Sequence, residues 1–168
     1  GMTGDKPDPN IRTPMQWTAG SNAGFSTGTP WHDINGDYKL RNVEDEAKDS
    51  GSLLSLYRQL TAIRANHYAL RSGSYVQVMV KGSGQALAVL RTAEKESVLV
   101  LVNLSKEPLQ NPTLKWDASS LKGTLKPSLL LGEGSPAALT VNDKGGVDAF
   151  QPLASIPGNG LEIIQFVP

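Results

Sequence analysis

Three runs of strand-forming residues between Ser74 and Leu104 constrain the fold more than any other part of the sequence. In the first run Val76, Val78 and Val80 fall on one face and polar residues on the other, which is the period-2 pattern of a half-buried strand. The stretch Val98–Val102 in the third run is apolar on both faces, as in a central strand covered on both sides. Because the turns between the runs are too short for a parallel crossover, we predict antiparallel pairing. The runs are SYVQVMVK (74–81), ALAVLRT (86–92) and ESVLVLVNLS (96–105).

The chain from residue 70 to residue 168 continues in the same way, with short apolar runs separated by turn signals. We expect further strands near 113–116, 124–131 and 161–167. We also expect a hairpin that joins 138–141 to 147–150 around the turn Asn142–Gly146. About seven or eight short strands in this spacing are typical of a sandwich. The predicted fold class is therefore mainly β, with an antiparallel Greek-key-type β-sandwich over residues 70–168.

The composition excludes several classes of protein. With 39% hydrophobic and 19% charged residues, the chain is globular rather than disordered. Lys+Arg and Asp+Glu are both 16, so the net charge is zero and no nucleic-acid partner is expected. No apolar run reaches the roughly 18 residues that cross a bilayer, so no membrane partner is expected either. There are no cysteines, and His32 and His67 are single and far apart, so we expect no metal and no cofactor.

A helix is predicted over about 52–66, within a segment that we assign to residues 49–69. Its apolar residues Leu53, Leu56, Tyr57, Leu60 and Ile63 recur at helical spacing. Candidate N-caps are Asp49, Ser50 and Ser52. If the apolar face of this helix lacks its partner, we expect the chain to self-associate through it or through the N-terminal arm.

Residues 1–48 show neither helical nor strand periodicity, and prolines interrupt them repeatedly. The segment nevertheless contains large apolar residues that would be costly to leave in water. Irregular loops of this length are uncommon in compact domains. We therefore expect that residues 1–48 pack against something elsewhere in a longer chain. The large residues are Ile11, Met15, Trp17, Phe25, Trp31 and Ile34.

One ordered set of motifs identifies a family. The segment Arg12–Trp17 (RTPMQW) is followed by Asn22–Ser26 (NAGFS), by Thr29-Pro30-Trp31 and by the helix SLLSLYRQL from Ser52 to Leu60. This order resembles the C-terminal third of α-amylase superfamily enzymes, glycoside hydrolase family 13. The nearest branch is that of the α-glucosidases, oligo-1,6-glucosidases and trehalose synthases. The resemblance is strongest over residues 11–71 and weaker in the sandwich.

The resemblance implies an architecture. Enzymes of this family carry their chemistry on a (β/α)8 barrel, which is followed by a small antiparallel sandwich called domain C. Residues 1–48 would be the loop after the last barrel strand, 49–69 the last barrel helix and 70–168 domain C. The catalytic carboxylates of the family lie on earlier barrel strands, so we expect no catalytic residue here and no activity of the chain alone. Its partners would be the missing N-terminal barrel and, through the parent enzyme, an α-glucoside or α-glucan.

Two residues are candidates for contact with sugar. The Arg that opens the RTPMQW motif binds the glucosyl unit in related α-glucosidases, so the resemblance makes Arg12 a substrate-binding residue of the parent enzyme. The alternative is a structural Arg that pairs with a barrel carboxylate. Trp116 could stack on a sugar if it were exposed, but a Trp that fills the sandwich core is the preferred interpretation.

Two further patterns have simpler interpretations. Four oxygen-bearing residues, Asp33, Asn35, Asp37 and Glu44, follow an EF-hand-like count, but the glycine falls at the wrong place and no helix precedes them, so we predict a turn rather than a calcium site. The glycosylation sequence at Asn103 closes a strand that we expect to be buried, so a chance match is preferred.

Three hypotheses for function are compatible with the sequence. The leading one is the C-terminal domain of an α-glucan- or α-glucoside-acting hydrolase, which supports the catalytic barrel. The alternatives are an autonomous carbohydrate-binding module and a protein-interaction domain without a sugar role. The RTPMQW motif favours the first, because a binding module has no need of a barrel loop.

Overall fold

The computed structural model describes residues 12–168. Residues 1–11, which open the irregular segment expected over 1–48, lie outside the described part. The chain divides into two compact units, residues 1–62 and residues 63–168. The boundary between them falls inside the longest helix, α2 (Leu53–Asn66).

The first unit consists mainly of loops, as its sequence predicts. It contains a short 3₁₀ segment η2 (Ser21–Gly24), a one-turn helix α1 (Val43–Glu46) that the sequence did not predict, and the first part of α2. The helix predicted over 52–66 is confirmed by α2, and so is one of its candidate caps. The hydroxyl of Ser52 accepts a hydrogen bond from Ser55 N–H at 3.1 Å and donates to Glu46 O at 2.7 Å. No residue of α2 is buried.

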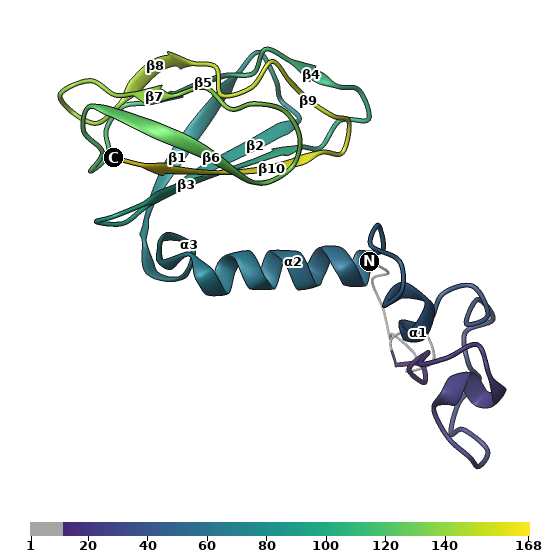
Figure 1. The fold of residues 1–168 in the computed structure, drawn as a ribbon. Helices are drawn as coiled ribbons and strands as arrows, with labels where there is room; N and C mark the ends of the chain where they lie inside the picture. Colours follow the sequence, from purple (N-terminus) through teal and green to yellow (C-terminus); the bar gives the residue numbers. More distant parts are fainter. Residues whose placement is uncertain (1–11) are drawn as a thin grey trace, which may run out of the picture. The chain divides into compact units, whose positions relative to one another are not determined.

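The second unit begins with the end of α2 and a short helix, α3 (Tyr68–Ser72), and continues as an antiparallel sandwich (Figure 1). The predicted fold class is confirmed. The principal sheet runs in the order β7-β6-β10-β3-β2-β1-β5-β8, and β4 and β9 form a separate two-stranded ribbon. The strands are β1 (Ser74–Lys81), β2 (Ala86–Thr92), β3 (Ser97–Asn103), β4 (Leu109–Gln110), β5 (Thr113–Trp116), β6 (Thr124–Leu131), β7 (Leu139–Thr140), β8 (Val147–Phe150), β9 (Ser155–Ile156) and β10 (Leu161–Val167).

Two long strands connect the layers of the sandwich. The first half of β1 pairs with β2, and its last residues, Met79–Lys81, pair with β5. Likewise Thr124 and Leu125 of β6 pair with β7, whereas the rest of β6 pairs with β10. Because β1 and β6 each change partners along their length, the sheet folds over on itself and encloses one core.

The core is formed by the inward positions that the alternation predicts. Val78 is buried, and Val76 and Val80 pack against the same cluster, which also contains Leu99 and Leu101 of β3. Three aromatic rings meet edge to face: the ring centroids of Trp116 and Phe150 are 6.4 Å apart, and those of Phe150 and Phe166 are 5.9 Å apart. Such edge-to-face contacts stabilise a core beyond the area that they bury.

The predicted hairpin is wrong. The segments 139–140 and 147–150 are strands, but β7 pairs with β6 and β8 pairs with β5. The intervening turn is stabilised by Asn142, whose side-chain oxygen accepts from Lys144 N–H at 2.9 Å and Gly146 N–H at 3.0 Å. Two backbone hydrogen bonds also close the turn, from Asn142 N–H to Gly146 O at 3.0 Å and from Gly145 N–H to Asn142 O at 2.8 Å. Beyond the turn the two strands pair with different neighbours. The short strands β4 and β9 were not predicted.

Candidate functional site

The RTPMQW motif lies in the first unit, where Gln16 connects it to the following segment. Gln16 Nε2 donates to Asp37 Oδ1 and to the backbone oxygen of Arg41, both at 2.8 Å. The backbone oxygens of Gln16 and Trp17 accept from Val43 N–H and Glu44 N–H, each at 3.0 Å. The motif is thereby fastened to the start of α1 by backbone and amide hydrogen bonds.

A left-handed turn follows the motif. Asn22, Ala23 and Gly24 all have positive φ, at 50°, 53° and 68°. Ala23 is fully buried, and its backbone oxygen accepts from Trp17 N–H at 2.9 Å and Thr18 N–H at 3.0 Å. A non-glycine residue in this conformation costs roughly 1–2 kcal/mol, so the surrounding contacts must hold it in place. The NAGFS motif is therefore a constrained turn that fixes the path of the chain after RTPMQW.

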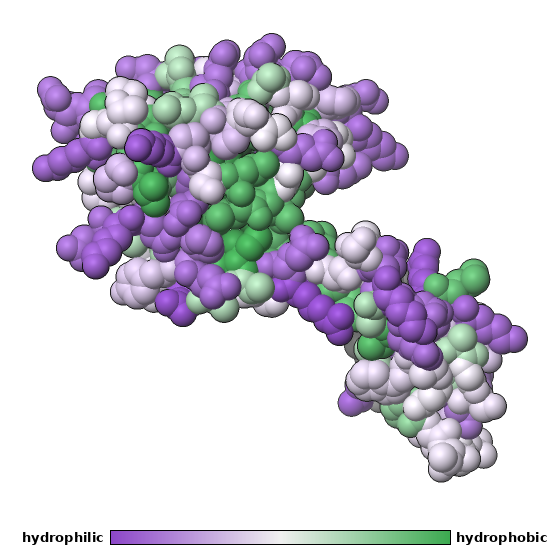
Figure 2. All heavy atoms as spheres, in the orientation of Figure 1, coloured by the Kyte–Doolittle hydropathy of each residue, from purple (hydrophilic) through white to green (hydrophobic). Residues whose placement is uncertain are grey.

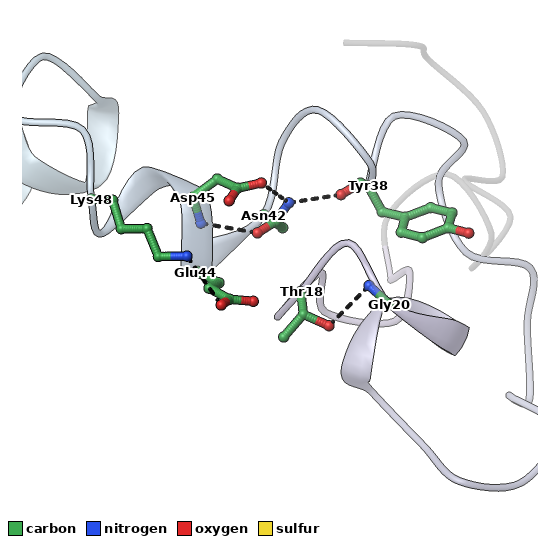
Figure 3. Close-up of polar contacts among 7 residues, drawn as sticks. All are labelled: Thr18, Gly20, Tyr38, Asn42, Glu44, Asp45 and Lys48. Atoms are coloured by element: carbon green, nitrogen blue, oxygen red, sulfur yellow. Dashed lines mark hydrogen bonds and ion pairs between the residues drawn. The ribbon is translucent and has the colours of Figure 1, made fainter.

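Asn42 organises the start of α1, as Figure 3 shows. Its Oδ1 accepts from Asp45 N–H at 3.0 Å, and its Nδ2 donates to Tyr38 O at 3.0 Å and to Asp45 Oδ2 at 2.8 Å. Asn42 is 3% exposed, so this amide is buried with partners for both of its polar atoms. The arrangement is a helix N-cap that also ties the turn before α1 to the helix.

An open hollow of about 570 Å³ lies in this unit. Apolar side chains of Pro14, Met15, Leu53 and Tyr57 line much of it, together with the polar group formed by Gln16, Asp37 and Arg41. Met15, Leu53 and Tyr57 are 49%, 63% and 61% exposed. The hollow is thus largely apolar and has no cover within the described residues of this unit.

The structure places Arg12 at the exposed start of the described chain, directly before Thr13, which lines the hollow. Its role as a sugar ligand stays a prediction. Asp37 lies in a turn and Asp33 and Asn35 lie directly before it, whereas Glu44 lies in α1. Asp37 accepts from Gln16 and pairs with Arg41, and Glu44 pairs with Lys48 at 3.1 Å. Among residues 12–168, no group of three or more acidic, His or Cys side chains is arranged to hold a metal ion.

The structure places Trp116 in the core of the sandwich. It is 3% exposed, and its indole N–H donates to Gly145 O at 2.9 Å. This burial agrees with the core interpretation and leaves the ring covered.

Asn103 is also buried, and its amide nitrogen donates to the backbone oxygens of Glu107 and Pro157 at 2.8 and 2.9 Å. The side chain therefore holds two loops together.

Sequence reasoning missed one polar centre, Glu96 in the turn between β2 and β3. Its carboxylate accepts from Ala69 N–H at 3.0 Å and Gln165 Nε2 at 2.8 Å, and it lies 2.9 Å from His67 Nδ1. Burial alone would raise the pKa of Glu96, but the hydrogen bonds from His67, Ala69 and Gln165 together outweigh it and lower the pKa. The partners come from distant parts of the sequence, so no local pattern could have identified this centre.

A second carboxylate of the sandwich, that of Glu162, is fully buried. Glu162 on β10 is 1% exposed, and its Oε2 accepts from Glu133 N–H at 2.9 Å. Burial raises the pKa of Glu162, and the nearby Glu133 carboxylate adds to this, while the hydrogen bond from Glu133 N–H opposes it. The side chain fits because Gly132 has no Cβ. A Cβ there would lie 1.7 Å from Glu162 Oε2.

Comparison with known proteins places these features in a family. The model of the α-amylase catalytic domain matches residues 2–73. Probable oligo-1,6-glucosidase 2 of Bacillus subtilis is 34% identical over 122 residues, which cover 73% of this chain and 21% of that protein. Trehalose-6-phosphate hydrolase of Escherichia coli is 35% identical over 114 residues, which cover 68% of this chain and 20% of that protein. An isomaltulose synthase from Erwinia rhapontici, solved with D-glucose, has 30% identity and a TM-score of 0.67, covering 95% of this chain and 26% of its own.

The chain therefore corresponds to a part of an α-amylase superfamily enzyme, glycoside hydrolase family 13, as the motifs indicate. It spans about a fifth of the length of the curated relatives that it matches. Those relatives are named as oligo-1,6-glucosidases and trehalose-6-phosphate hydrolases. In the part of the chain that the structure describes, no helix is long and apolar enough to cross a membrane.

Proposed function

We propose that this chain is the C-terminal part of an α-glucoside-acting or α-glucan-acting hydrolase and that it supports the catalytic barrel. In this proposal, residues 1–48 are the loop after the last barrel strand, 49–69 the last barrel helix and 70–168 domain C. The match to the catalytic-domain model ends at residue 73, directly before β1 begins at Ser74, which supports a domain boundary at this place. The substrate is bound by the whole enzyme, with Arg12 as a sugar-contacting residue.

The observation that carries the proposal is the exposure of large apolar side chains in the first unit. Trp31, Leu53 and Tyr57 are each more than 60% exposed, and Met15 and Trp17 about half exposed. Covering one such side chain stabilises a fold by about 1.5–3 kcal/mol, so a loop segment of this composition gains most of its stability from a partner. A catalytic barrel, of which the matched segment is one part in the relatives, would supply that cover.

The acidic side chains of the first unit support a structural role rather than catalysis. A retaining glycosidase needs two carboxyl groups about 5–5.5 Å apart that are free to act as nucleophile and as acid/base. Asp37 instead accepts from Gln16, Asp45 accepts from Asn42, and Glu46 accepts from Leu54 N–H. These groups stabilise turns and helix ends. The chemistry would then belong to carboxylates elsewhere in the enzyme.

The test combines an assay and a titration. We expect the chain alone to hydrolyse neither maltose nor isomaltose. We also expect no saturable backbone amide shifts when the labelled chain is titrated with maltose, isomaltose or a longer maltooligosaccharide at millimolar concentration. Shifts clustered on one face of the sandwich would contradict the proposal and identify a carbohydrate-binding module. Hydrolysis of either sugar by the purified chain itself would contradict the proposal that the chain lacks the catalytic carboxylates.

A further inference from the structure

The sequence joins an asparagine directly to a glycine at two places, Asn35-Gly36 and Asn159-Gly160. Asparagine is chemically labile in this context, because the backbone nitrogen of the next residue can attack its side-chain carbonyl and a glycine leaves that nitrogen unhindered. The attack needs a nitrogen that no hydrogen bond holds and a backbone that can turn toward the side chain. The fold therefore decides which of the two pairs reacts.

The pair Asn35-Gly36 lies in the loop unit, at the start of the turn that leads to α1. Both residues are exposed, and a Cβ built on Gly36 would meet nothing within 4 Å. Within residues 12–168, no hydrogen bond involves the side chain of Asn35 or the backbone nitrogen of Gly36. Tyr38 N–H donates to Asn35 O at 3.3 Å, which is long for a hydrogen bond. The attacking nitrogen and the amide that it attacks are thus both unrestrained.

Water also has access to this unit. Figure 2 shows polar and weakly polar residues over much of the visible surface of the loop unit. An intermediate formed at Asn35 is therefore open to hydrolysis.

The pair Asn159-Gly160 is held by the sandwich. Gly160 N–H donates to Pro157 O at 3.0 Å, and Asn159 N–H donates to Ser105 O at 2.7 Å. Gly160 O accepts from Asn103 N–H at 2.9 Å, and a Cβ on Gly160 would lie 2.7 Å from Pro157 O. The nitrogen of Gly160 is bonded and the backbone around it is crowded, so this turn must open locally before it can react.

We propose that Asn35 is a site of spontaneous deamidation and backbone isomerisation, and that the fold protects Asn159. A bond forms between Gly36 N and Asn35 Cγ, the Cγ–Nδ2 bond breaks, and the amide nitrogen leaves as ammonia with the proton from Gly36 N–H. The product is a five-membered succinimide. Water then opens the ring: cleavage at Cγ gives aspartate, and cleavage at the backbone carbonyl gives isoaspartate, in which the chain runs through Cγ. One water enters and one ammonia leaves, and nothing is oxidised. This inference does not depend on the proposed function.

The modification changes the turn that fastens the RTPMQW motif. Isoaspartate adds a methylene to the backbone and a negative charge next to Asp33 and Asp37. Asp37 accepts from Gln16 at 2.8 Å, and Tyr38 O accepts from Asn42 Nδ2, as Figure 3 shows. We expect the isoaspartate form to exchange its amide hydrogens faster over residues 37–44, with the sandwich unchanged.

The test follows both pairs in one sample. The chain is kept in mildly alkaline buffer for several days and digested, and mass spectrometry with fragmentation that separates isoaspartate from aspartate measures conversion at each asparagine. We expect conversion at Asn35 to be roughly fivefold faster or more than at Asn159, because a backbone hydrogen bond must break before Gly160 can react. In urea, where the fold is lost, the two rates should become similar. Gly36→Ala, which the open space accommodates, should slow conversion at Asn35 in the folded chain.

Each contrary result has a definite meaning. Equal rates in the folded chain, or faster conversion at Asn159, would overturn the proposal. A difference that persists unchanged in urea would assign it to the neighbouring residues in the sequence and would overturn the protection by the fold. An unchanged rate in Gly36→Ala would show that the nitrogen of residue 36 is not the attacking group.

Discussion

Different interactions stabilise the loop unit of residues 12–62 and the sandwich unit of residues 63–168. In the sandwich, inward side chains such as Leu99, Leu114 and Phe166 are fully buried in one cluster. In the loop unit, the large apolar residues are partly or mostly exposed, and the order comes from polar groups such as Gln16 and Asn42. The difference shows that the sandwich carries its own core, whereas the loop unit has the hydrogen bonds of a folded segment without its core.

The contrast between the two units is tested by a pair of aromatic truncations. Phe166→Ala removes a fully buried ring, and we expect it to lower the free energy of unfolding of the sandwich by about 3–5 kcal/mol. Trp31→Ala removes a ring that is 61% exposed, and we expect a change within about 0.5 kcal/mol in the isolated chain. Urea unfolding followed by circular dichroism measures both. Equal losses would show that the loop unit has a core of its own.

A pair of glycine substitutions tests how the sandwich accommodates the buried carboxylate of Glu162. At Gly132 a Cβ would lie 1.7 Å from Glu162 Oε2, so Gly132→Ala must displace a buried carboxylate from its hydrogen bond with Glu133. We expect a loss of about 1–3 kcal/mol in the free energy of unfolding. Gly82→Ala is the control, since Gly82 also has positive φ but nothing within 4 Å, and only the backbone cost should remain. A loss at Gly82 as large as that at Gly132 would assign the whole effect to backbone conformation.

The polar framework of the loop unit is tested at a helix cap. Asn42→Ala removes the side-chain acceptor of Asp45 N–H and the donor to Tyr38 O, and we expect a local loss of about 1 kcal/mol. Lys48→Ala, which breaks only an exposed pair with Glu44, should cost at most a few tenths of a kcal/mol. Hydrogen exchange of residues 43–49 measures the difference. Faster exchange in the sandwich as well would show that the two units unfold together.

The smallest effect is expected in the pH dependence that Glu96 contributes. Because its pKa in the folded state is lowered, the carboxylate stabilises the fold at pH values above its ordinary pKa. This contribution is lost as the pH falls through the lowered folded value. Unfolding free energies between about pH 6 and pH 3 should therefore fall less steeply in Glu96→Gln than in the unchanged chain. An identical slope in both proteins would remove Glu96 from the acid response.

The elements that depend on local periodicity could be predicted from the sequence. Alternation in 74–81 and the apolar stretch 97–103 predict β1 and β3, and helical spacing over 52–66 predicts α2, because these patterns repeat within a few residues. The ordered motifs from RTPMQW onward were enough to name the family. The absence of periodicity in residues 1–48 likewise predicted an irregular segment, and the described part of that segment consists mainly of loops.

The pairing of the strands and the contacts between distant polar groups could not be predicted from the sequence. The segments 139–140 and 147–150 looked like one hairpin, but their hydrogen-bonding partners β6 and β5 come from elsewhere in the chain. The centre at Glu96 joins this carboxylate to a group 69 residues away in the sequence, and the burial of Glu162 depends on a missing Cβ at Gly132. Such contacts are set by long-range packing, which compensates the cost of burying a charge only after the whole sandwich has closed.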